Sequence, residues 1–248
     1  MVSSFDLNCD LGEGIANDPL IIPFISSVNI ACGYHAGDST SMKQTLELAM
    51  EYQVAAGAHP SFPDKENFGR TEMHLPARKI YDLVKEQVET LANMAIKYNY
   101  PLHHVKPHGA LYNMAAKDEE ISTSICEAIL DLDCNLIVYA PSKSKLASVA
   151  TSMHIKTCNE VFADRYYRSD GSLVPRSQPK ALIDNEDAMA KQLLQILTQQ
   201  SLTAEDGKTI PVKVDTICLH GDGEHALEFA RLINELLYLN NIALKPMG

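Results

Sequence analysis

The sequence has few positive charges and no long apolar run. Its 21 lysines and arginines are outnumbered by 32 aspartates and glutamates, which gives a formal net charge of -11, and the positive residues do not cluster. Because nucleic-acid binding depends on clustered positive charge, we expect no nucleic-acid partner. A bilayer span needs about 18 consecutive apolar residues, and no run in the sequence reaches that length, so we expect no membrane segment either.

Signals for export and for disulfide bonds are also missing. No lysine or arginine precedes Lys43, so the sequence lacks the basic start of a signal peptide and the arginine-rich character of a transit peptide. The six cysteines have no CxxC spacing, and most of them fall in apolar, strand-like runs, as Cys9 and Cys32 do. This placement is typical of small buried thiols. We therefore expect a cytoplasmic protein with reduced cysteines.

No linker or repeat divides the chain. The sequence contains no Ser/Gly-rich linker, no block of like charge and no internal repeat, and 46% of its 248 residues are hydrophobic. This is enough apolar material for one large core, although the length suits two smaller domains as well as one α/β barrel. We expect a single domain over residues 1–248.

The sequence does contain a series of apolar runs that lead to His, Asp or Lys next to Gly or Pro. Five such runs, FDLNCD, VNIACG, VAAGAHP, HHVKPHG and DTICLHGD, lead in turn to Asp10, His35, His59, Lys106 with His108, and His220 with Asp222. A barrel of parallel strands gathers the C-terminal ends of its strands at one mouth, where barrel enzymes keep their chemistry. The pattern therefore predicts an enzyme with its site at that mouth.

Strand-like and helix-like segments alternate along the chain. About seven apolar, strand-like segments are separated by segments whose apolar residues repeat at helical spacing, at residues 42–50, 76–95, 119–130, 144–151, 189–197 and 226–237. Strands that are joined through helices form parallel sheets. We therefore predict an α/β fold with a seven-stranded parallel β/α barrel, and an open doubly wound sheet is the alternative.

Two connections, residues 60–75 and 163–182, are too long to be simple turns. Loops of this length in a compact domain are usually lids or binding loops. The chain has only six arginines, and four of them lie in these two loops: Arg70, Arg165, Arg168 and Arg176. Arginine binds carboxylate and phosphate groups through paired hydrogen bonds, so the clustering predicts an anionic substrate. The alternative is that these arginines pair with acidic residues of the same loops.

Seven longer motifs make the sequence similar to a known family. In chain order they are DLNCDLGEG (6–14), NIACGYHAGD (29–38), GAHPSFPD (57–64), FGR (68–70), VKPHGALYN (105–113), EVFADRYY (160–167) and CLHGD (218–222). These segments resemble the signature segments of the LamB/YcsF family. The resemblance implies a β/α barrel similar to the glycoside hydrolase and polysaccharide deacetylase barrels. It also implies ATP-dependent opening of a small anionic lactam, 5-oxoproline, to glutamate in a 5-oxoprolinase complex with partner subunits B and C.

Hydrolysis of a lactam needs an activated carbonyl oxygen, a positioned water and a proton for the leaving nitrogen. Our catalytic candidates are Asp10, Glu13, His35, His59, Lys106 and His108. The carboxylates and imidazoles suit acid and base roles near neutral pH, and the lysine ammonium suits a developing oxyanion or an acyl phosphate. Which group is acid and which is base depends on burial and neighbours and stays open.

Residues expected to bind the substrate lie beside these candidates. They are Asn8, Asn29, Asp38, Arg70, Asp164, Arg165, Arg176 and His220. The two asparagines have an alternative role, which is to orient the catalytic groups. Asp38 and Asp222 each precede a helix-like segment, where aspartate is a favoured N-cap. We expect four further histidines to be structural or exposed, namely His74, His103, His154 and His225.

Two alternative functions stay open. One is a metal-dependent, deacetylase-like amide hydrolase in which Asp10, His35 and His59 hold the metal, although no HExxH pair on a helix supports it. The other is a non-catalytic carrier protein that holds the substrate for partner proteins. No GxxxxGK[ST] motif and no GxGxxG turn between a strand and a helix occurs. ATP is therefore implied by the resemblance alone, and the partner subunits are a second possible location for it.

Overall fold

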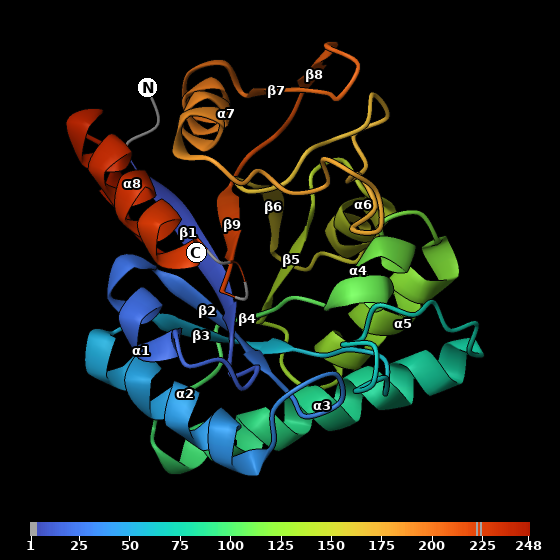
Figure 1. The fold of residues 1–248 in the computed structure, drawn as a ribbon. Helices are drawn as coiled ribbons and strands as arrows, with labels where there is room; N and C mark the ends of the chain where they lie inside the picture. The colour runs from blue at the N-terminus through green and yellow to red at the C-terminus, as the bar shows by residue number, and fades with distance from the viewer. Residues whose placement is uncertain (1–3, 222, 224) are drawn as a thin grey trace.

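A closed barrel of parallel strands forms the centre of the molecule (Figure 1). The computed structural model describes residues 4–221, 223 and 225–248. In spatial order the barrel strands are β1 (Ser4–Leu11), β2 (Ser27–Ala31), β3 (Ala55–His59), β4 (His104–Val105), β5 (Ile137–Pro141), β6 (Thr157–Phe162) and β9 (Thr216–His220). Because β9 also pairs with β1, the ring is closed. The predicted seven-stranded parallel barrel is confirmed, and the open sheet is wrong.

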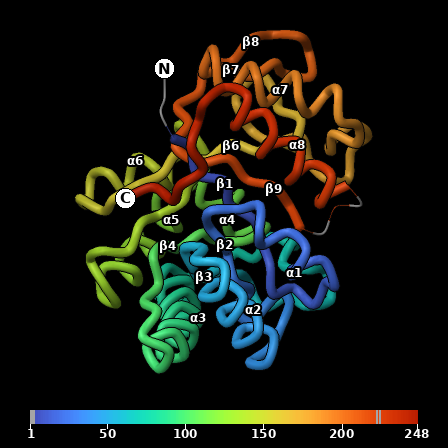
Figure 2. The backbone as a smooth tube through the Cα atoms, turned by 90° about the vertical axis from the view of Figure 1, so that its left-hand side faces the viewer, coloured from blue at the N-terminus to red at the C-terminus, as the bar shows by residue number. Residues whose placement is uncertain are grey.

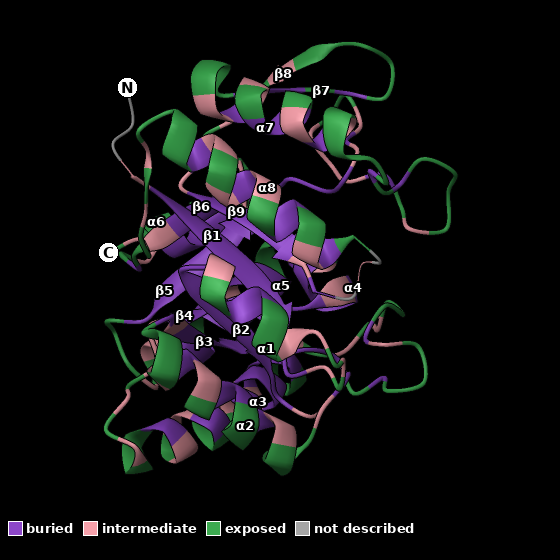
Figure 3. Cartoon of the chain, turned by 60° about the vertical axis from the view of Figure 1, so that its left-hand side comes forward, coloured by how far each residue is buried: buried purple, intermediate pink, exposed green. Residues whose placement is uncertain are grey.

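The register of the strands brings their C-terminal ends level with one another. Asp10 of β1 pairs with Asn29 of β2 on one side and with His220 of β9 on the other, and Ala31 of β2 pairs with His59 of β3. The barrel strands are almost entirely buried, whereas the helices are buried along one stripe (Figure 3). Strands covered on both faces are expected to read as nearly continuous apolar runs, which is how they stand out in the sequence.

Helices surround the barrel. They are α1 (Asp18–Ile21), the 3-10 helix η1 (Ile22–Phe24), α2 (Ser39–Tyr52), α3 (Ala77–Lys97), α4 (Gly109–Ala115), α5 (Glu119–Leu130), α6 (Lys145–Ser152), α7 (Glu186–Gln199) and α8 (Ala226–Leu239). Figures 1 and 2 both place α2 and α3 on one side of the barrel and α7 on the opposite side. The six helices expected from the spacing are confirmed. The sequence did not predict α1 and α4, because four and seven residues are too few to establish a helical period.

The best predicted helix is α3. It follows Pro76, whose restricted backbone suits the start of a helix. The residues expected on its apolar face are all buried, namely Ile80, Val84, Val88, Leu91 and Ala95. Because these residues recur every three or four positions, one stripe of the helix packs on the barrel and the rest meets solvent.

Three short strands were not predicted. β7 (Ser201–Thr203) and β8 (Thr209–Pro211) form an antiparallel hairpin, and β10 (Ala243–Leu244) pairs with the first two residues of β1. Strands of two or three residues are too short to show an alternating pattern. The hairpin lies beside α7, at the top of Figure 1, away from the strands β2, β3 and β4.

The two long connections were predicted correctly. Residues 60–75, which the structure describes throughout, contain no helix or strand, and residues 163–182 contain only the isolated bridges Arg165–Leu182 and Tyr167–Leu173. All six cysteines are free, and all but Cys134 are buried. Among the described helices, none has the length and hydropathy needed to cross a bilayer. Asp222, expected to cap a helix, lies outside the described residues.

Candidate active site

Five polar side chains from five strands meet at the C-terminal mouth of the barrel. Asp10 belongs to β1, His59 ends β3, Lys106 follows β4, Glu160 belongs to β6 and His220 ends β9. All five line one cavity of about 1040 Å³. Four of them were expected there from the sequence, because parallel strands deliver their C-terminal ends to one mouth.

Lys106 is the centre of a buried ion cluster. Its Nζ lies 2.9 Å from Asp10 Oδ1 and 3.0 Å from Glu160 Oε1, and it donates to Cys218 Sγ at 3.0 Å. The side chains of Lys106, Asp10 and Glu160 are 2%, 6% and 0% exposed. Burial by itself lowers the pKa of Lys106, but Asp10, Cys218 and Glu160 outweigh it and raise that pKa well above its ordinary value. The cluster therefore holds one positive charge between two carboxyl groups.

The carboxylate of Asp10 is held from two sides. Its Oδ1 accepts hydrogen bonds from Lys106 and, at 2.7 Å, from Asn29 Nδ2, and its Oδ2 lies 3.3 Å from His59 Nε2. Burial alone would raise the pKa of Asp10, but the charges of His59 and Lys106 hold it well below its ordinary range. Asp10 is therefore ionised, and a carboxylate at a cavity wall can orient a water molecule or accept its proton.

Asn8 and Asn29 lie beneath this cluster. Both are fully buried, and neither lines the cavity. Asn29 Nδ2 donates to Asn8 Oδ1 at 2.7 Å, Asn8 Nδ2 donates to Glu160 Oε1 at 2.8 Å, and Asn8 Oδ1 accepts from Lys106 at 3.2 Å. These contacts favour the alternative role, in which the two asparagines orient the charged side chains.

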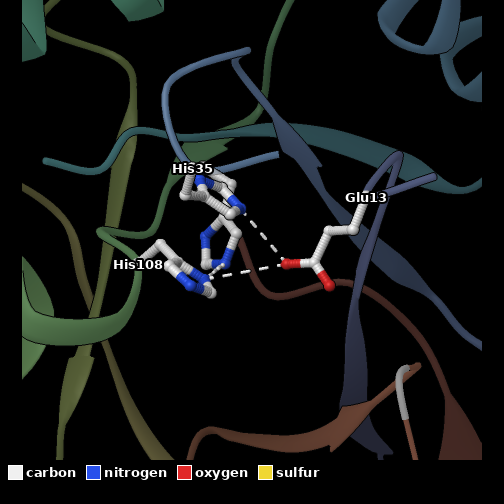
Figure 4. A group of neighbouring side chains, drawn as sticks. Glu13, His35 and His108 are labelled. Carbon is white, nitrogen blue, oxygen red and sulfur yellow. Dashed lines mark hydrogen bonds and ion pairs between the residues drawn. The ribbon is translucent and has the colours of Figure 1, made fainter. Parts of the chain in front are cut away.

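Three histidines and Glu13 form a second cluster beside Asp10 (Figure 4). His59 Nε2 lies 2.9 Å from His108 Nδ1, His35 Nε2 lies 3.2 Å from Glu13 Oε1, and His108 Nδ1 lies 3.7 Å from the same oxygen. The rings of His35 and His108 are stacked with their centroids 3.8 Å apart. His59 and His108 line the cavity, whereas the side chains of His35 and Glu13 are buried and do not.

Backbone oxygens fix the protonation of two of these rings. His59 Nδ1 lies 2.7 Å from the carbonyl oxygen of Lys106, and His108 Nε2 lies 3.0 Å from that of Phe68. A carbonyl oxygen can only accept a hydrogen bond, so both of these nitrogens carry hydrogen. The inner nitrogens, His59 Nε2 and His108 Nδ1, are the ones that face each other.

The third ring is fixed through a hydroxyl group. Ser61 Oγ donates to the carbonyl oxygen of Phe62 at 3.0 Å and therefore accepts from His35 Nδ1 at 2.9 Å. Burial lowers the pKa of His35 to about 3 and places the pKa of His108 well below its ordinary value. These two rings are therefore neutral near pH 7, and each carries a lone pair on the nitrogen that faces the cluster.

On the opposite wall, His220 and Asp164 form a pair. His220 Nδ1 lies 2.9 Å from Asp164 Oδ2, and the His220 ring stacks on Phe162 with a centroid separation of 5.1 Å. Burial would raise the pKa of Asp164, but His220 outweighs it and lowers that pKa. The carboxylate thus holds His220 Nδ1, which leaves Nε2 as the ring nitrogen that can exchange a proton. Asp164 itself does not line the cavity, so its expected contact with substrate becomes a contact with His220.

The four loop arginines line the same cavity, as the clustering indicated. Arg165 is buried and forms its hydrogen bonds within the loop, because it donates to the carbonyl oxygens of Ala181 and Val174 at 3.1 and 2.6 Å. The guanidinium of Arg70 lies over the Phe68 ring, 4.9 Å from its centroid. Arg165 therefore shapes the wall, while Arg70, Arg168 and Arg176 supply positive charge along it.

Asp38 is a helix cap and lies away from the cavity. Its side chain accepts from the backbone nitrogens of Thr40 and Ser41 at 2.8 and 3.0 Å, and Ser41 Oγ in turn accepts from the Asp38 nitrogen. This is a capping box at the start of α2, so the capping role is confirmed, and Asp38 is not among the residues that line the cavity. His74, His154 and His225 are exposed, as expected.

Sequence reasoning missed three residues of the cavity wall. Glu160 holds Lys106, Tyr112 donates a short hydrogen bond to Glu160 Oε2, and the Phe162 ring faces the Lys106 ammonium at 5.3 Å. All three lie in motifs that carried the family resemblance, VKPHGALYN and EVFADRYY. Only their position within those motifs could have identified them as site residues, because neither a strand nor a helix period marks them.

Within the described residues, two groups of side chains have a geometry suited to a metal ion. One consists of Glu13, His35, His59 and His108, and the other of Asp10, Cys218 and His220. The expected ligand set of Asp10, His35 and His59 is corrected, because the structure groups the two histidines with His108 and Glu13, while Asp10 Oδ1 is bound by the Lys106 ammonium.

Comparison with known proteins gives a full-length match. Residues 5–248 match the model of the LamB/YcsF family. The chain is 44% identical over 251 residues to a Tolumonas auensis protein that is named as the A subunit of 5-oxoprolinase, and the alignment covers 99% of this chain and 100% of the relative.

Solved structures agree with that match. The lactam utilization protein from Thermus thermophilus superimposes with a TM-score of 0.92 at 34% identity, covering 98% of this chain and 100% of that one. A family 4 carbohydrate esterase from Streptomyces lividans gives a TM-score of 0.52 at 9% identity, covering 99% of this chain and 93% of that one. The second similarity concerns the barrel fold alone.

Proposed function

Because the chain belongs to the LamB/YcsF family, we propose that it is the A subunit of a 5-oxoprolinase, which opens the lactam of 5-oxoproline to glutamate with hydrolysis of ATP. The name of the Tolumonas relative supports this function. The structural observation that carries it is an ionised carboxylate, Asp10, at the wall of a cavity whose loops carry four arginines. The arginines would bind an anionic group of the substrate, and Asp10 would act beside its reacting carbonyl group.

The arginine wall would bind the carboxylate of 5-oxoproline. Arg70, Arg168 and Arg176 line the cavity on the side of the two long loops. Paired hydrogen bonds from a guanidinium fix both the position and the orientation of a carboxylate. In this pose the lactam ring would point toward the strand ends, where Asp10 and His220 lie.

Asp10 and His220 would share the proton transfers. A nitrogen of His220 and an oxygen of Asp10 lie within 4.8 Å of each other, so one water or one substrate atom can contact both. Asp10 would orient the attacking water, and His220, held by Asp164, would deliver a proton to the leaving nitrogen. Lys106 and Asn29 would keep Asp10 ionised and in place.

ATP would supply the activation that the barrel residues lack. Transfer of the γ-phosphoryl group to the lactam oxygen makes the ring carbon electrophilic. Attack by water then breaks the C–N bond as the nitrogen takes a proton, and leaves an acyl phosphate that a second water hydrolyses to glutamate and phosphate. The cavity of about 1040 Å³ is at the upper end of ligand pockets, roughly 300 to 1,000 Å³, which leaves room for a phosphorylated lactam. We propose that subunits B and C complete the nucleotide site.

The test is release of glutamate from 5-oxoproline, with and without ATP, by this chain alone and by its mixture with subunits B and C. We expect glutamate only in the complete mixture with ATP. Asp10→Asn and His220→Gln should each lower turnover by about 10²- to 10⁴-fold, as expected for loss of an acid or base. Asp38→Ala, which removes a distant helix cap, is the control and should retain turnover.

Two results would contradict this proposal. No glutamate from any mixture, with the activity of subunits B and C verified, would exclude 5-oxoprolinase activity. Unchanged turnover of Asp10→Asn in an intact complex would instead assign the chain a carrier role, because the chemistry would then lie on a partner protein.

A further inference from the structure

We propose that Glu13, His35, His59 and His108 bind one divalent transition-metal ion. The four ligand atoms, three imidazole nitrogens and one carboxylate oxygen, lie within 4.8 Å of one another. They come from four separate segments of the chain, so no spacing in the sequence marks them as a set. The cluster is buried at the end of the barrel and borders the cavity through His59 and His108.

The distances between the ligand atoms fit a tetrahedral site. Ligands at about 2.0 to 2.1 Å from zinc in a tetrahedron lie roughly 3.3 to 3.4 Å from one another. The measured separations are 3.2 Å for His35 Nε2 and Glu13 Oε1, 3.7 Å for His108 Nδ1 and Glu13 Oε1, and 2.9 Å for His59 Nε2 and His108 Nδ1. Shifts of a few tenths of an ångström would bring these three of the six separations to the tetrahedral value, and the other three lie within 4.8 Å.

The outer nitrogen of each ring already has the partner that metal-binding histidines require. Such histidines donate their other N–H group to a carbonyl oxygen, a carboxylate or a similar acceptor, which fixes the ring and its tautomer. His59 donates to the carbonyl oxygen of Lys106, His108 donates to that of Phe68, and His35 donates to Ser61 Oγ. As a result, all three rings direct the nitrogen that a metal ion would bind toward the interior of the cluster.

This arrangement of lone pairs favours a cation at the centre. His59 Nε2 and His108 Nδ1 lie 2.9 Å apart, and both are the nitrogens left without hydrogen when the rings are neutral. Two lone pairs at this distance would repel each other, so without a metal ion a proton must lie between these two nitrogens, with the Glu13 carboxylate on the same side. A metal ion bound by all four groups would take the place of that proton.

The stacking of His35 and His108 identifies the movement that binding requires. Their rings are nearly parallel, at 6°, with centroids 3.8 Å apart, whereas a metal ion lies close to the plane of each ring that binds it. One ring must therefore turn. Gly69 allows both histidines to pack this closely, because a Cβ at that position would stand 2.8 Å from His35 Cβ and 2.9 Å from His108 Cδ2.

The second group of possible ligands is already neutralised. Asp10, Cys218 and His220 surround the Lys106 ammonium, which lies 2.9 Å from Asp10 Oδ1 and 3.0 Å from Cys218 Sγ. A divalent cation there would be repelled by Lys106. The other group, Glu13, His35, His59 and His108, consists of a carboxylate and three imidazoles and includes no lysine or arginine, so the metal is assigned to it.

The ligand types restrict the choice of metal. Three imidazoles with one carboxylate suit zinc, cobalt, nickel or iron, whereas magnesium and calcium prefer oxygen ligands. Because the site adjoins Asp10 across the 3.3 Å separation between His59 Nε2 and Asp10 Oδ2, a bound ion would lie beside the cavity. With four protein ligands its tetrahedron would be complete, so the ion would fix the positions of His59 and His108 at the cavity wall.

The experiment is titration of the chelator-treated full chain with Co²⁺, followed by visible absorption, with Zn²⁺ as competitor. We expect one equivalent of Co²⁺, absorption bands of tetrahedral intensity, and loss of those bands when Zn²⁺ is added. His59→Ala and Glu13→Gln should each weaken binding by more than tenfold. His74→Ala, which removes an exposed histidine from the loop at residues 60–75, is the matched control and should bind as the parent chain does.

A milder variant keeps the proposal testable if a ligand variant fails to fold. Ser61→Ala leaves all four ligands in place but removes the acceptor for His35 Nδ1, and loss of such a partner costs about 10- to 100-fold in metal affinity. Absence of stoichiometric Co²⁺ binding by the folded parent chain would overturn the proposal. Equal losses in Ser61→Ala and His74→Ala would also overturn it. The readout is binding alone, so its outcome is independent of the lactam reaction.

Discussion

Lys106→Met should destabilise the protein strongly, although Lys106 lies at the mouth of the barrel. The substitution keeps the length of the side chain but removes the ammonium held between Asp10 and Glu160, which lie 2.9 and 3.0 Å from Nζ and are 6% and 0% exposed. The charge of this cluster changes from one net negative charge to two. Loss of one partner from a buried ion pair costs about 3 to 5 kcal/mol, because the remaining charge is left uncompensated.

The assay is urea unfolding followed by far-ultraviolet circular dichroism, since the chain contains no tryptophan for fluorescence. Lys145→Met is the matched control: Lys145 Nζ lies 3.0 Å from Glu119 Oε2, but the two side chains are 51% and 71% exposed, so the loss should stay below about 1 kcal/mol.

A double variant tests the cause of the loss. In Lys106→Met with Glu160→Gln, the cluster returns to one negative charge, and we expect a coupling free energy of about 1 to 3 kcal/mol between the two positions. A loss for Lys106→Met no larger than that of the Lys145 control, or additivity of the two changes, would refute the reasoning, because the charges would then be stabilised independently.

Three further predictions concern other parts of the barrel. Gly57→Ala should destabilise the protein by about 1 to 3 kcal/mol in urea unfolding, because a Cβ there would stand 2.2 Å from the buried His104 ring; an unchanged midpoint would contradict this packing. Burial raises the pKa of Asp6 above its ordinary 3.8, so its contribution to stability is full below that pH and is lost as the pH rises through the raised value. The free energy of unfolding of the parent chain minus that of Asp6→Asn should therefore fall with rising pH in urea titrations, and a constant difference would refute the assignment. Asp38→Ala should cost about 0.5 to 2 kcal/mol of stability and leave the Michaelis constant for 5-oxoproline unchanged; a raised Michaelis constant would return Asp38 to the substrate site.

The sequence was sufficient to predict the barrel because burial on both faces makes its strands continuous apolar runs. Each run led to a polar residue, and for Asp10, His59, Lys106 and His220 this predicted their shared location at the cavity wall. A strand end marks where a side chain lies along the barrel axis. Parallel pairing then brings all such ends together without further information.

The partners of those residues could not be predicted in the same way. Glu160 contacts Asn8 across 152 positions of the chain, and only the closed ring, in which β9 pairs with both β6 and β1, brings them together. Asn8 and Asn29 are fully buried, and Asn29 donates hydrogen bonds to Asn8 and to Asp10. Burial at this depth favours support of Asp10 over contact with substrate. No pattern in the sequence reveals it. The capping role of Asp38 could be predicted, because a capping box depends only on residues that are close in the sequence.

The pairing of β1 with β9 also sets a condition on how the protein is made. Asp6 and Thr216, which are register partners, are 210 positions apart, so at 5 to 20 residues per second the ribosome needs roughly 10 to 40 s after β1 to synthesise its second neighbour. During this interval β1 is an apolar edge with no partner on one side, the kind of edge that recruits strands from other chains. A nascent chain that stalls before Thr216 thus lacks His220 and also exposes an open sheet to chaperones and to other nascent chains on the same message.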